Sequence, residues 1–292
     1  MSFRELAQAL VNGSLLGGVY GGVAMGLSLV LGVLRIVNLA HSAVLIFGAL
    51  VYWELVNGLG LDPLLMIVPI AVGGYLLGLG VHRGLTQYLA RESDSTVLLG
   101  FFGLMVVIES IAIMVWTTDT RTVNAGYLSS VLRFGGISVP VTRIVAAAIT
   151  VAVLVALHLF LTRTLTGAAI RGMAENPDVA ALVGIEVGTL SRRIFAVGIA
   201  LAAFGGTVLS LVQSFNPQEH VRWLAWAFLV VILGGLGSAM RTLLAGVFVG
   251  IFETVVGLLV PFQYTYLALY ALLAIALLVR NEGLGAVRAR TI

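Results

Sequence analysis

Long apolar segments separated by short polar ones make up most of this 292-residue chain. A transmembrane helix needs roughly 20 mostly apolar residues to cross about 30 Å of hydrocarbon. The pattern therefore predicts an all-α membrane protein, a polytopic bundle of about eight or nine transmembrane or half-spanning helices in one domain over residues 1–292. The apolar segments cover residues 8–34, 43–57, 63–82, 95–116, 141–161, 194–213, 223–233, 242–260 and 262–279.

The segment Leu31–Gly48 interrupts this pattern, because it carries Arg35, Asn38, His41 and Ser42 between two hydrophobic runs. Polar or irregular backbone inside a membrane is tolerated only where protein buries it or water reaches it. If the backbone stayed helical, Arg35, Asn38 and Ser42 would share one face. Two interpretations stay open: these side chains line a permeation route or gate, or they satisfy broken backbone and brace neighbouring helices.

A second interruption follows Leu233, where a glycine-rich stretch separates two short apolar segments. Both interruptions begin with a Leu-Gly pair. Transporters often carry paired broken helices in their two halves, with the functional site nearby. The candidate residues of a substrate pathway or gate are therefore Asn38, His41, Ser42, Gly234, Gly235 and Gly237.

Two local patterns predict close packing and a turn. Glycines recur every four residues in the first apolar segment, which places them in stripes where helices can approach closely. A Gly-Gly pair between two short β-prone runs predicts a hairpin over residues 131–139. The glycine stripes are Gly13, Gly17 and Gly21, and Gly18, Gly22 and Gly26.

The polar loop 162–193 contains the signals of a short helix. Asn176 is a suitable N-cap, Pro177 suits the first helical position, and Gly184 suits the C-terminal stop. The resulting helix has about two turns, and isolated helices of that length are marginal in water. An apolar face of Val179, Leu182 and Val183 either lies on the protein's own bundle or docks onto a partner; both interpretations stay open.

Composition excludes several classes of chemistry. The chain is 60% hydrophobic and 10% charged, whereas soluble domains are nearer a quarter charged. It has no cysteine and no lysine, so thiol chemistry, a Walker A loop and a lysine Schiff base are excluded. No His, Asp or Glu spacing indicates a metal site. The net charge of +3 indicates no nucleic-acid partner.

Glu109 and Glu253 lie inside apolar segments, where acidic residues are costly and are functional hypotheses by default. Each could also sit at headgroup level or pair with an arginine. His158 and His220 stand alone in the sequence, and the chain shows no dense relay of acids and histidines.

Arginine distribution predicts the orientation of the bundle. The loops 82–94 and 162–193 and the C-terminal tail hold nine arginines, against five on the opposite side. Positively charged loops favour the cytoplasm, so we expect these loops and the C-terminus inside. The N-terminus shows no cleavage site after a short apolar core, so we expect the first segment to stay in the mature protein.

Four motifs resemble those of one transporter family, in order along nearly the whole chain. Residues 36–42, IVNLAHS, resemble the (I/V)NxAHG signature of the branched-chain amino acid permeases of ATP-binding-cassette (ABC) importers. Arg171–Ile185 resembles the central cytoplasmic segment of that family. Asn216-Pro217, followed by LGGLGS at 233–238, resembles its NP…LGGxGS stretch, and NEGLG at 281–285 echoes its terminal PTGLxG. Ser42 departs from the usual glycine, and Asn281-Glu282 replaces the usual Pro-Thr.

The resemblance implies a permease subunit in a bacterial plasma (inner) membrane that takes up branched-chain or related amino acids. Such a subunit would be non-catalytic, not an enzyme, and would bind no cofactor of its own. Its partners would be a second permease subunit in a heterodimer, two cytoplasmic ATPase subunits that bind ATP, and an extracytoplasmic substrate-binding protein. The short central helix would be the coupling helix seated in an ATPase groove. The coupling residues would be Arg171, Gly172, Ala174, Glu175, Asn176, Pro177, Ala180, Ala181 and Gly184.

Three alternatives remain open at this point. Permeases of the same family take up urea, short amides or small organic acids. A secondary transporter would couple uptake to H⁺ or Na⁺ through Glu109 or Glu253. A passive channel for a small neutral solute would fit the high glycine content.

Overall fold

The computed structural model describes residues 2–89 and 92–279. Helices dominate it, and the β-strands of this part form a single hairpin. The long helices are α1 (Phe3–Leu34), α2 (His41–Trp53), α3 (Ile67–Val81), α5 (Asp94–Trp116), α6 (Val141–Arg163), α9 (Val187–Ser210), α10 (His220–Gly234), α11 (Ala239–Leu259) and α12 (Phe262–Val279). The short elements are η1 (Glu54–Gly58), η2 (His82–Thr86), α4 (Gln87–Leu89), η3 (Gly126–Leu128), β1 (Val131–Phe134), β2 (Ile137–Pro140), α7 (Leu165–Glu175), α8 (Pro177–Leu182) and η4 (Pro217–Glu219).

Six helices of the described chain are long and apolar enough to cross a membrane. They are α1, α5, α6, α9, α11 and the continuous stretch Ile67–Leu89 that begins with α3. The helices α2 and α10, which flank the two predicted breaks, have only 13 and 15 residues. The all-α, polytopic fold with broken helices is therefore confirmed.

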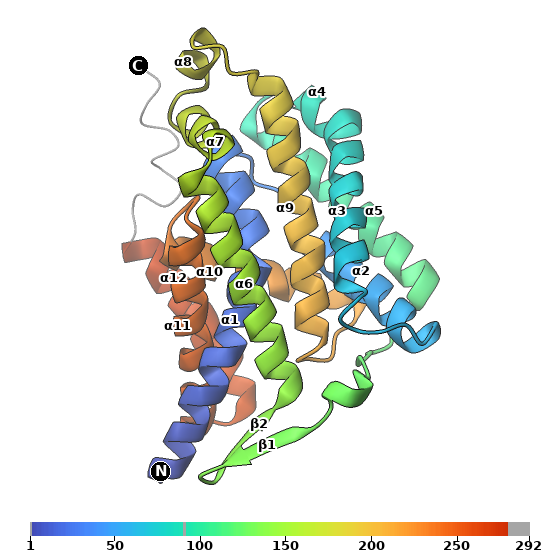
Figure 1. Cartoon of the computed structure of the whole chain (residues 1–292), viewed down its shortest axis with the longest axis vertical. Coiled ribbons are helices and arrows are strands. Elements are labelled where there is room, and N and C mark those ends of the chain that lie inside the picture. Colours follow the sequence, from blue (N-terminus) through green and yellow to red (C-terminus); the bar gives the residue numbers. More distant parts are fainter. Residues whose placement is uncertain (1, 90–91, 280–292) are drawn as a thin grey trace.

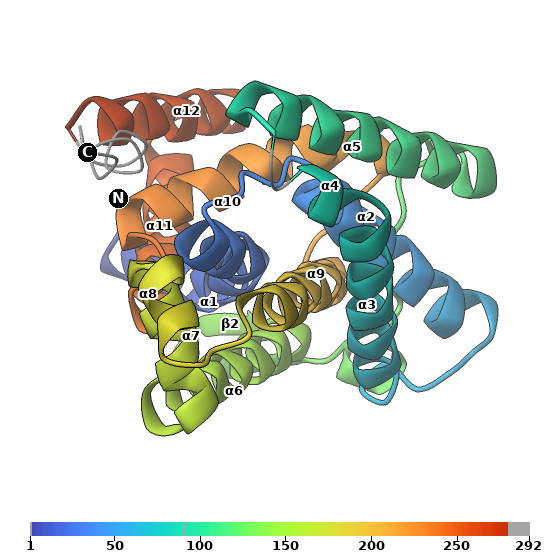
Figure 2. The same ribbon diagram turned by 90° about the horizontal axis from the view of Figure 1, so that it is seen from above.

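The core of the bundle is built around α1 and α9 (Figure 2). In their most apolar windows, 89% of α1 and 83% of α9 is buried, against 22%, 17% and 22% for the Ile67–Leu89 stretch, α5 and α6. A helix that is apolar all round belongs in a protein core or against lipid. We infer that α1 and α9 are enclosed by protein, whereas the outer helices turn apolar side chains toward lipid.

Glycines bring α1 and α11 into backbone contact. The helices run antiparallel, so that Gly13 faces Gly250, and Gly17 faces Gly246. A Cβ atom on Gly17 would overlap the backbone of Gly246, so any side chain there would force the helices apart. The other glycine stripe packs differently: Gly18 and Gly22 face α6, and Gly26 faces α9.

The predicted hairpin is confirmed, and it fixes one end of the bundle. Gly135 and Gly136 turn with φ angles of +56° and +83°, which favour glycine. The Gln8 side chain donates to Ser138 O and accepts from Ser138 N, both at 2.7 Å. The hairpin and the start of α1 thus lie together, at the opposite end from α4, α7 and α8 (Figure 1). The described parts of loops 82–94 and 162–193 share that far end, as the orientation prediction requires.

The α1–α11 contact predicts a sharp difference between two glycines. We expect Gly17→Leu to lose most of its folded protein, because the clash with backbone exceeds the roughly 1–3 kcal/mol of ordinary overpacking. Gly73→Leu on α3 is the matched control, since a Cβ atom there meets nothing within 4 Å. Size-exclusion profiles and thermal midpoints in detergent measure both. Equal amounts of folded protein and equal thermal midpoints in the two variants would contradict the glycine contact.

Candidate functional site

The first predicted break is a real interruption of the helix. α1 ends at Leu34, and Arg35 adopts a left-handed conformation with φ 57° and ψ 26°. Such a conformation costs a non-glycine residue roughly 1–2 kcal/mol. Helix resumes only at His41, where α2 begins. Arg35, Asn38 and Ser42 therefore do not share a helical face, because the shared face required an unbroken helix.

Three of the four polar residues of this break, Asn38, His41 and Ser42, are buried, whereas Arg35 is exposed. His41 is 1% exposed, and its Nε2 donates to the Val23 carbonyl in α1 at 2.9 Å. The backbone carbonyl of Asn38 accepts from the His41 backbone N at 3.3 Å, and Ser42 Oγ donates to the Leu39 backbone O at 3.4 Å. These are the contacts of groups that brace a broken backbone. The side chains of His41 and Ser42 thus bond to backbone, whereas Asn38 Oδ1 is buried without a hydrogen-bond partner among the described residues. Contact of any of the three with solute stays a prediction.

The second break meets the first. Gly235 and Gly237 have positive φ angles of 79° and 73° between α10 and α11. Gly237 N donates to the backbone carbonyl of Ser28 at 3.2 Å, and its Cα packs on Gly32 of α1. Thr242 Oγ1 donates to Ser28 Oγ at 3.1 Å. Two segments that look alike in the sequence are therefore in direct contact, at the end of the bundle that carries α7.

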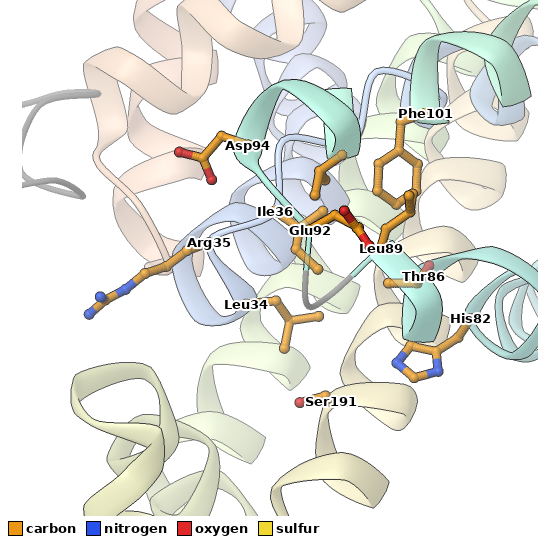
Figure 3. A pocket seen from close by; sticks show the side chains of 11 residues that line it. Leu34, Arg35, Ile36, His82, Thr86, Leu89, Glu92, Asp94, Phe101 and Ser191 are labelled. Carbon is orange, nitrogen blue, oxygen red and sulfur yellow. The ribbon is translucent and has the colours of Figure 1, made fainter. Parts of the chain in front are cut away.

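A cavity of about 270 Å³ opens beside the first break (Figure 3). Its walls combine apolar side chains with a histidine, two carboxylates and two hydroxyls. Figure 3 shows the Arg35 side chain pointing away from Glu92, Thr86 and His82. The charged guanidinium of Arg35 therefore lies away from the other polar residues of this cavity. The lining residues are Leu34, Arg35, Ile36, His82, Thr86, Leu89, Glu92, Asp94, Val97, Phe101 and Ser191.

A second cavity, of about 430 Å³, lies where the two breaks meet α6 and α7. Two arginines, Arg171 and Arg241, and one carboxylate, that of Glu175, line this cavity, so basic side chains predominate. This cavity brings together residues from both predicted sets, because Gly237 of the second break and Arg171, Ala174 and Glu175 of the coupling segment all line it. By contrast, Asn38, His41 and Ser42 line neither of these two cavities.

The predicted short helix is confirmed as α8. Asn176 Oδ1 accepts from the backbone N–H groups of Asp178 and Val179 at 3.0 and 3.2 Å. Pro177 occupies the first helical turn, and Gly184 leaves the helix with a φ of +87°. The local sequence signals alone were sufficient to place this helix.

The apolar side chains of α8 project away from the bundle. Val179, Leu182 and Val183 are 54%, 86% and 73% exposed, whereas Ala180 is 4% exposed and faces the protein. The helix thus lies on the protein's own bundle through Ala180, whereas these three side chains do not pack on it, and docking onto a partner stays a prediction. Figure 1 shows α8 at the extreme end of the molecule, where a partner could reach it. Exposed apolar side chains gathered on one short helix are typical of an interaction site.

One contact of the site could not be found from the sequence. Arg35 Nη2 donates to the carbonyls of Ala174 and Glu175, the last two residues of α7, at 3.2 and 3.4 Å. The partners are 139 and 140 residues apart in the sequence. In the sequence, the position of Arg35 next to a predicted helix break was the one indication that its side chain could have a structural role.

The two acidic residues of the apolar segments have partners. Tyr20 donates to Glu253 Oε2 at 2.6 Å, and Gln213 Nε2 donates to the Tyr20 hydroxyl at 3.1 Å. Glu109 Oε1 lies 3.8 Å from His220 Nδ1, and that nitrogen donates to Pro217 O at 3.1 Å; the sequence did not indicate the nearness of His220 to Glu109. His158 lines the cavity at the meeting of the two breaks. Among the described residues, no group of three His, Asp or Glu could hold a metal ion.

A bundle of apolar helices, two of them interrupted near one end, defines a polytopic α-helical membrane protein. The family model described as "Branched-chain amino acid transport system / permease component" matches residues 9–278. The chain therefore belongs to this family of branched-chain amino acid transport permeases. The terminal motif at 281–285 lies outside the described residues.

Two relatives of similar length, and a longer one, are named as permease proteins of branched-chain amino acid transport systems. BraD of Pseudomonas aeruginosa, a high-affinity branched-chain amino acid transport system permease protein, is 27% identical over 291 residues, which cover 95% of this chain and 94% of BraD. LivH of Escherichia coli is 25% identical over 297 residues, covering 97% and 96%. LivM of Escherichia coli is 26% identical over 295 residues, covering 91% of this chain and 67% of LivM. No solved structure matches the chain.

The bracing contact of His41 predicts a stability effect. We expect His41→Ala to lower the thermal midpoint in detergent, because it leaves a cavity and removes a hydrogen bond, the latter costing about 0.5–1.5 kcal/mol. His41→Gln should recover part of the loss, since its amide can still donate to Val23 O. An unchanged midpoint in His41→Ala, together with lost solute uptake, would instead indicate direct contact with solute.

Proposed function

We propose that this chain is the permease subunit of an ABC importer that takes up branched-chain or related amino acids. Separate ATPase subunits drive it, and a substrate-binding protein delivers the solute. The observation that carries the proposal is the family match, which covers nearly the entire chain from residue 9 to residue 278. A non-catalytic role fits the absence of lysine, because a Walker A loop needs one.

The relatives support a pair of permease subunits. LivH and LivM of Escherichia coli both bear the name of a high-affinity branched-chain amino acid transport system permease protein, and both resemble this chain. Two different permeases named for one kind of system favour a heterodimer. We propose that this chain is one member of such a pair, in a bacterial inner membrane.

Coupling to ATP hydrolysis is assigned to α7 and α8. We place this end of the bundle in the cytoplasm, because arginine-rich loops favour that side. The exposed side chains of Val179, Leu182 and Val183 suit a hydrophobic groove on an ATPase subunit, where an amphipathic helix inserts its apolar face. Closure of the ATPase pair would then move α8 and switch the pathway between its two openings.

Reconstitution tests the proposal. The chain is coexpressed with its candidate second permease and ATPase subunits, purified, and placed in proteoliposomes with the binding protein. We expect these subunits to co-purify and leucine uptake to require ATP. Uptake by this chain alone that an ionophore dissipates would establish a secondary transporter instead, and flux without ATP or a gradient-coupling ion would establish a channel.

The exposed position of Ala181 predicts a specific loss of coupling. We expect Ala181→Glu to lower ATP-dependent uptake at least about tenfold, since a buried unpaired charge in the docking groove costs several kcal/mol. Gly172→Glu should act similarly, because Gly172 is exposed on α7. Gly84→Glu in η2 is the control: a Cβ atom there also meets nothing within 4 Å. Normal uptake by stably expressed Ala181→Glu would contradict docking through α8.

A further inference from the structure

We propose that Arg35 is a positioning residue that carries movement of the α7–α8 segment to the first break. The inference rests on the proposed function, because it concerns how docking at α8 reaches the transport route. Its basis is one side chain that joins two functional segments from opposite parts of the sequence.

At one end, the guanidinium holds the last turn of α7. The final carbonyls of a helix have no intrahelical partner, and a cation placed there is favoured by the helix dipole. Arg35 donates to Ala174 O and Glu175 O. The next residue is Asn176, whose side chain caps α8. A displacement of α8 therefore pulls directly on the carbonyls that Arg35 binds.

At the other end, the backbone of Arg35 closes α1. Its left-handed conformation is unusual for a non-glycine residue, and its N–H still donates to Leu31 O at 3.2 Å. The neighbours Leu34 and Ile36 form part of the wall of the cavity in Figure 3. A pull on the guanidinium therefore shifts this wall. Gly32, which lies one helical turn before Arg35, packs on Gly237, so the second break is also close to Arg35.

Apolar packing also joins the segments, since Val33 of α1 and Ile170 and Met173 of α7 belong to one buried cluster. Such packing resists separation but has little directional preference, because dispersion is spread over many weak contacts. The arginine adds direction, since its planar donor group fixes the geometry of the carbonyls it binds. The experiments therefore have to separate the effect of the Arg35 hydrogen bonds from that of the apolar packing.

The first test measures coupling in the reconstituted complex. The Arg35→Gln side chain ends at the position of the arginine Nε, short of the Nη2 that binds both carbonyls. We therefore expect Arg35→Gln to keep ATP hydrolysis within about twofold of wild type while solute transported per ATP falls at least about tenfold. Arg35→Lys should restore part of this ratio, because an ammonium group can still donate to the carbonyls. Arg83→Gln is the matched control, an exposed arginine of η2 that does not line the cavity. A wild-type ratio in Arg35→Gln, or an equal loss in Arg83→Gln, would overturn the inference.

The second test needs only the full chain. Because the protein has no cysteine, spin labels on Asp178→Cys and Gly84→Cys report the position of α8 relative to η2. We expect a narrow distance distribution that Arg35→Gln broadens and Arg35→Lys narrows again. An unchanged distribution in Arg35→Gln would refute the link even where ATP-driven uptake is established. Absence of ATP-driven uptake with a broadened distribution would instead refute the proposed function and leave the Arg35 contact standing.

Discussion

Close approach of α1 and α11 is the constraint on which the rest of the structure depends. Between apolar helices in lipid there is little hydrophobic driving force, so association relies on tight packing and hydrogen bonds. Gly17 and Gly246 supply the packing, with no side chain between the two backbones. Ser28 supplies hydrogen bonds farther along, where it accepts from Gly237 and Thr242. Together these contacts fix how α11 is aligned along α1, and this alignment brings the two helix breaks together.

The breaks then organise the functional end of the molecule. Non-helical backbone at membrane depth is tolerated only where protein or water satisfies it. Here Ser28 accepts from the Gly237 N–H of the second break, and His41 ties the start of α2 to the Val23 carbonyl of α1. The cavities lie beside the interrupted backbone, and α7 rests against it through Arg35. In the proposed importer, a firmly packed α1–α11 pair would thus hold the route, while the lightly anchored α8 would receive the ATPase.

Local signals predicted much of this arrangement, and long-range contacts did not follow from them. Hydropathy located the spans, and Asn176, Pro177 and Gly184 located α8, because capping and turn chemistry act over a few residues. Glycine spacing indicated a close contact without identifying α11 as the partner. The burial of Asn38, the nearness of His220 to Glu109 and the bond from Arg35 to α7 depend on tertiary packing, which one sequence does not encode in any short pattern.

Amide hydrogen exchange of the chain, alone and bound to its ATPase subunits, tests the central claim most directly. The account predicts that α8 (Pro177–Leu182) exchanges rapidly in the chain alone and becomes protected on ATPase binding. It also predicts slow exchange around Gly17 and Gly246 in both states, because that contact is structural. ATPase binding that leaves α8 unprotected, or rapid exchange along the α1–α11 contact in the free chain, would contradict it.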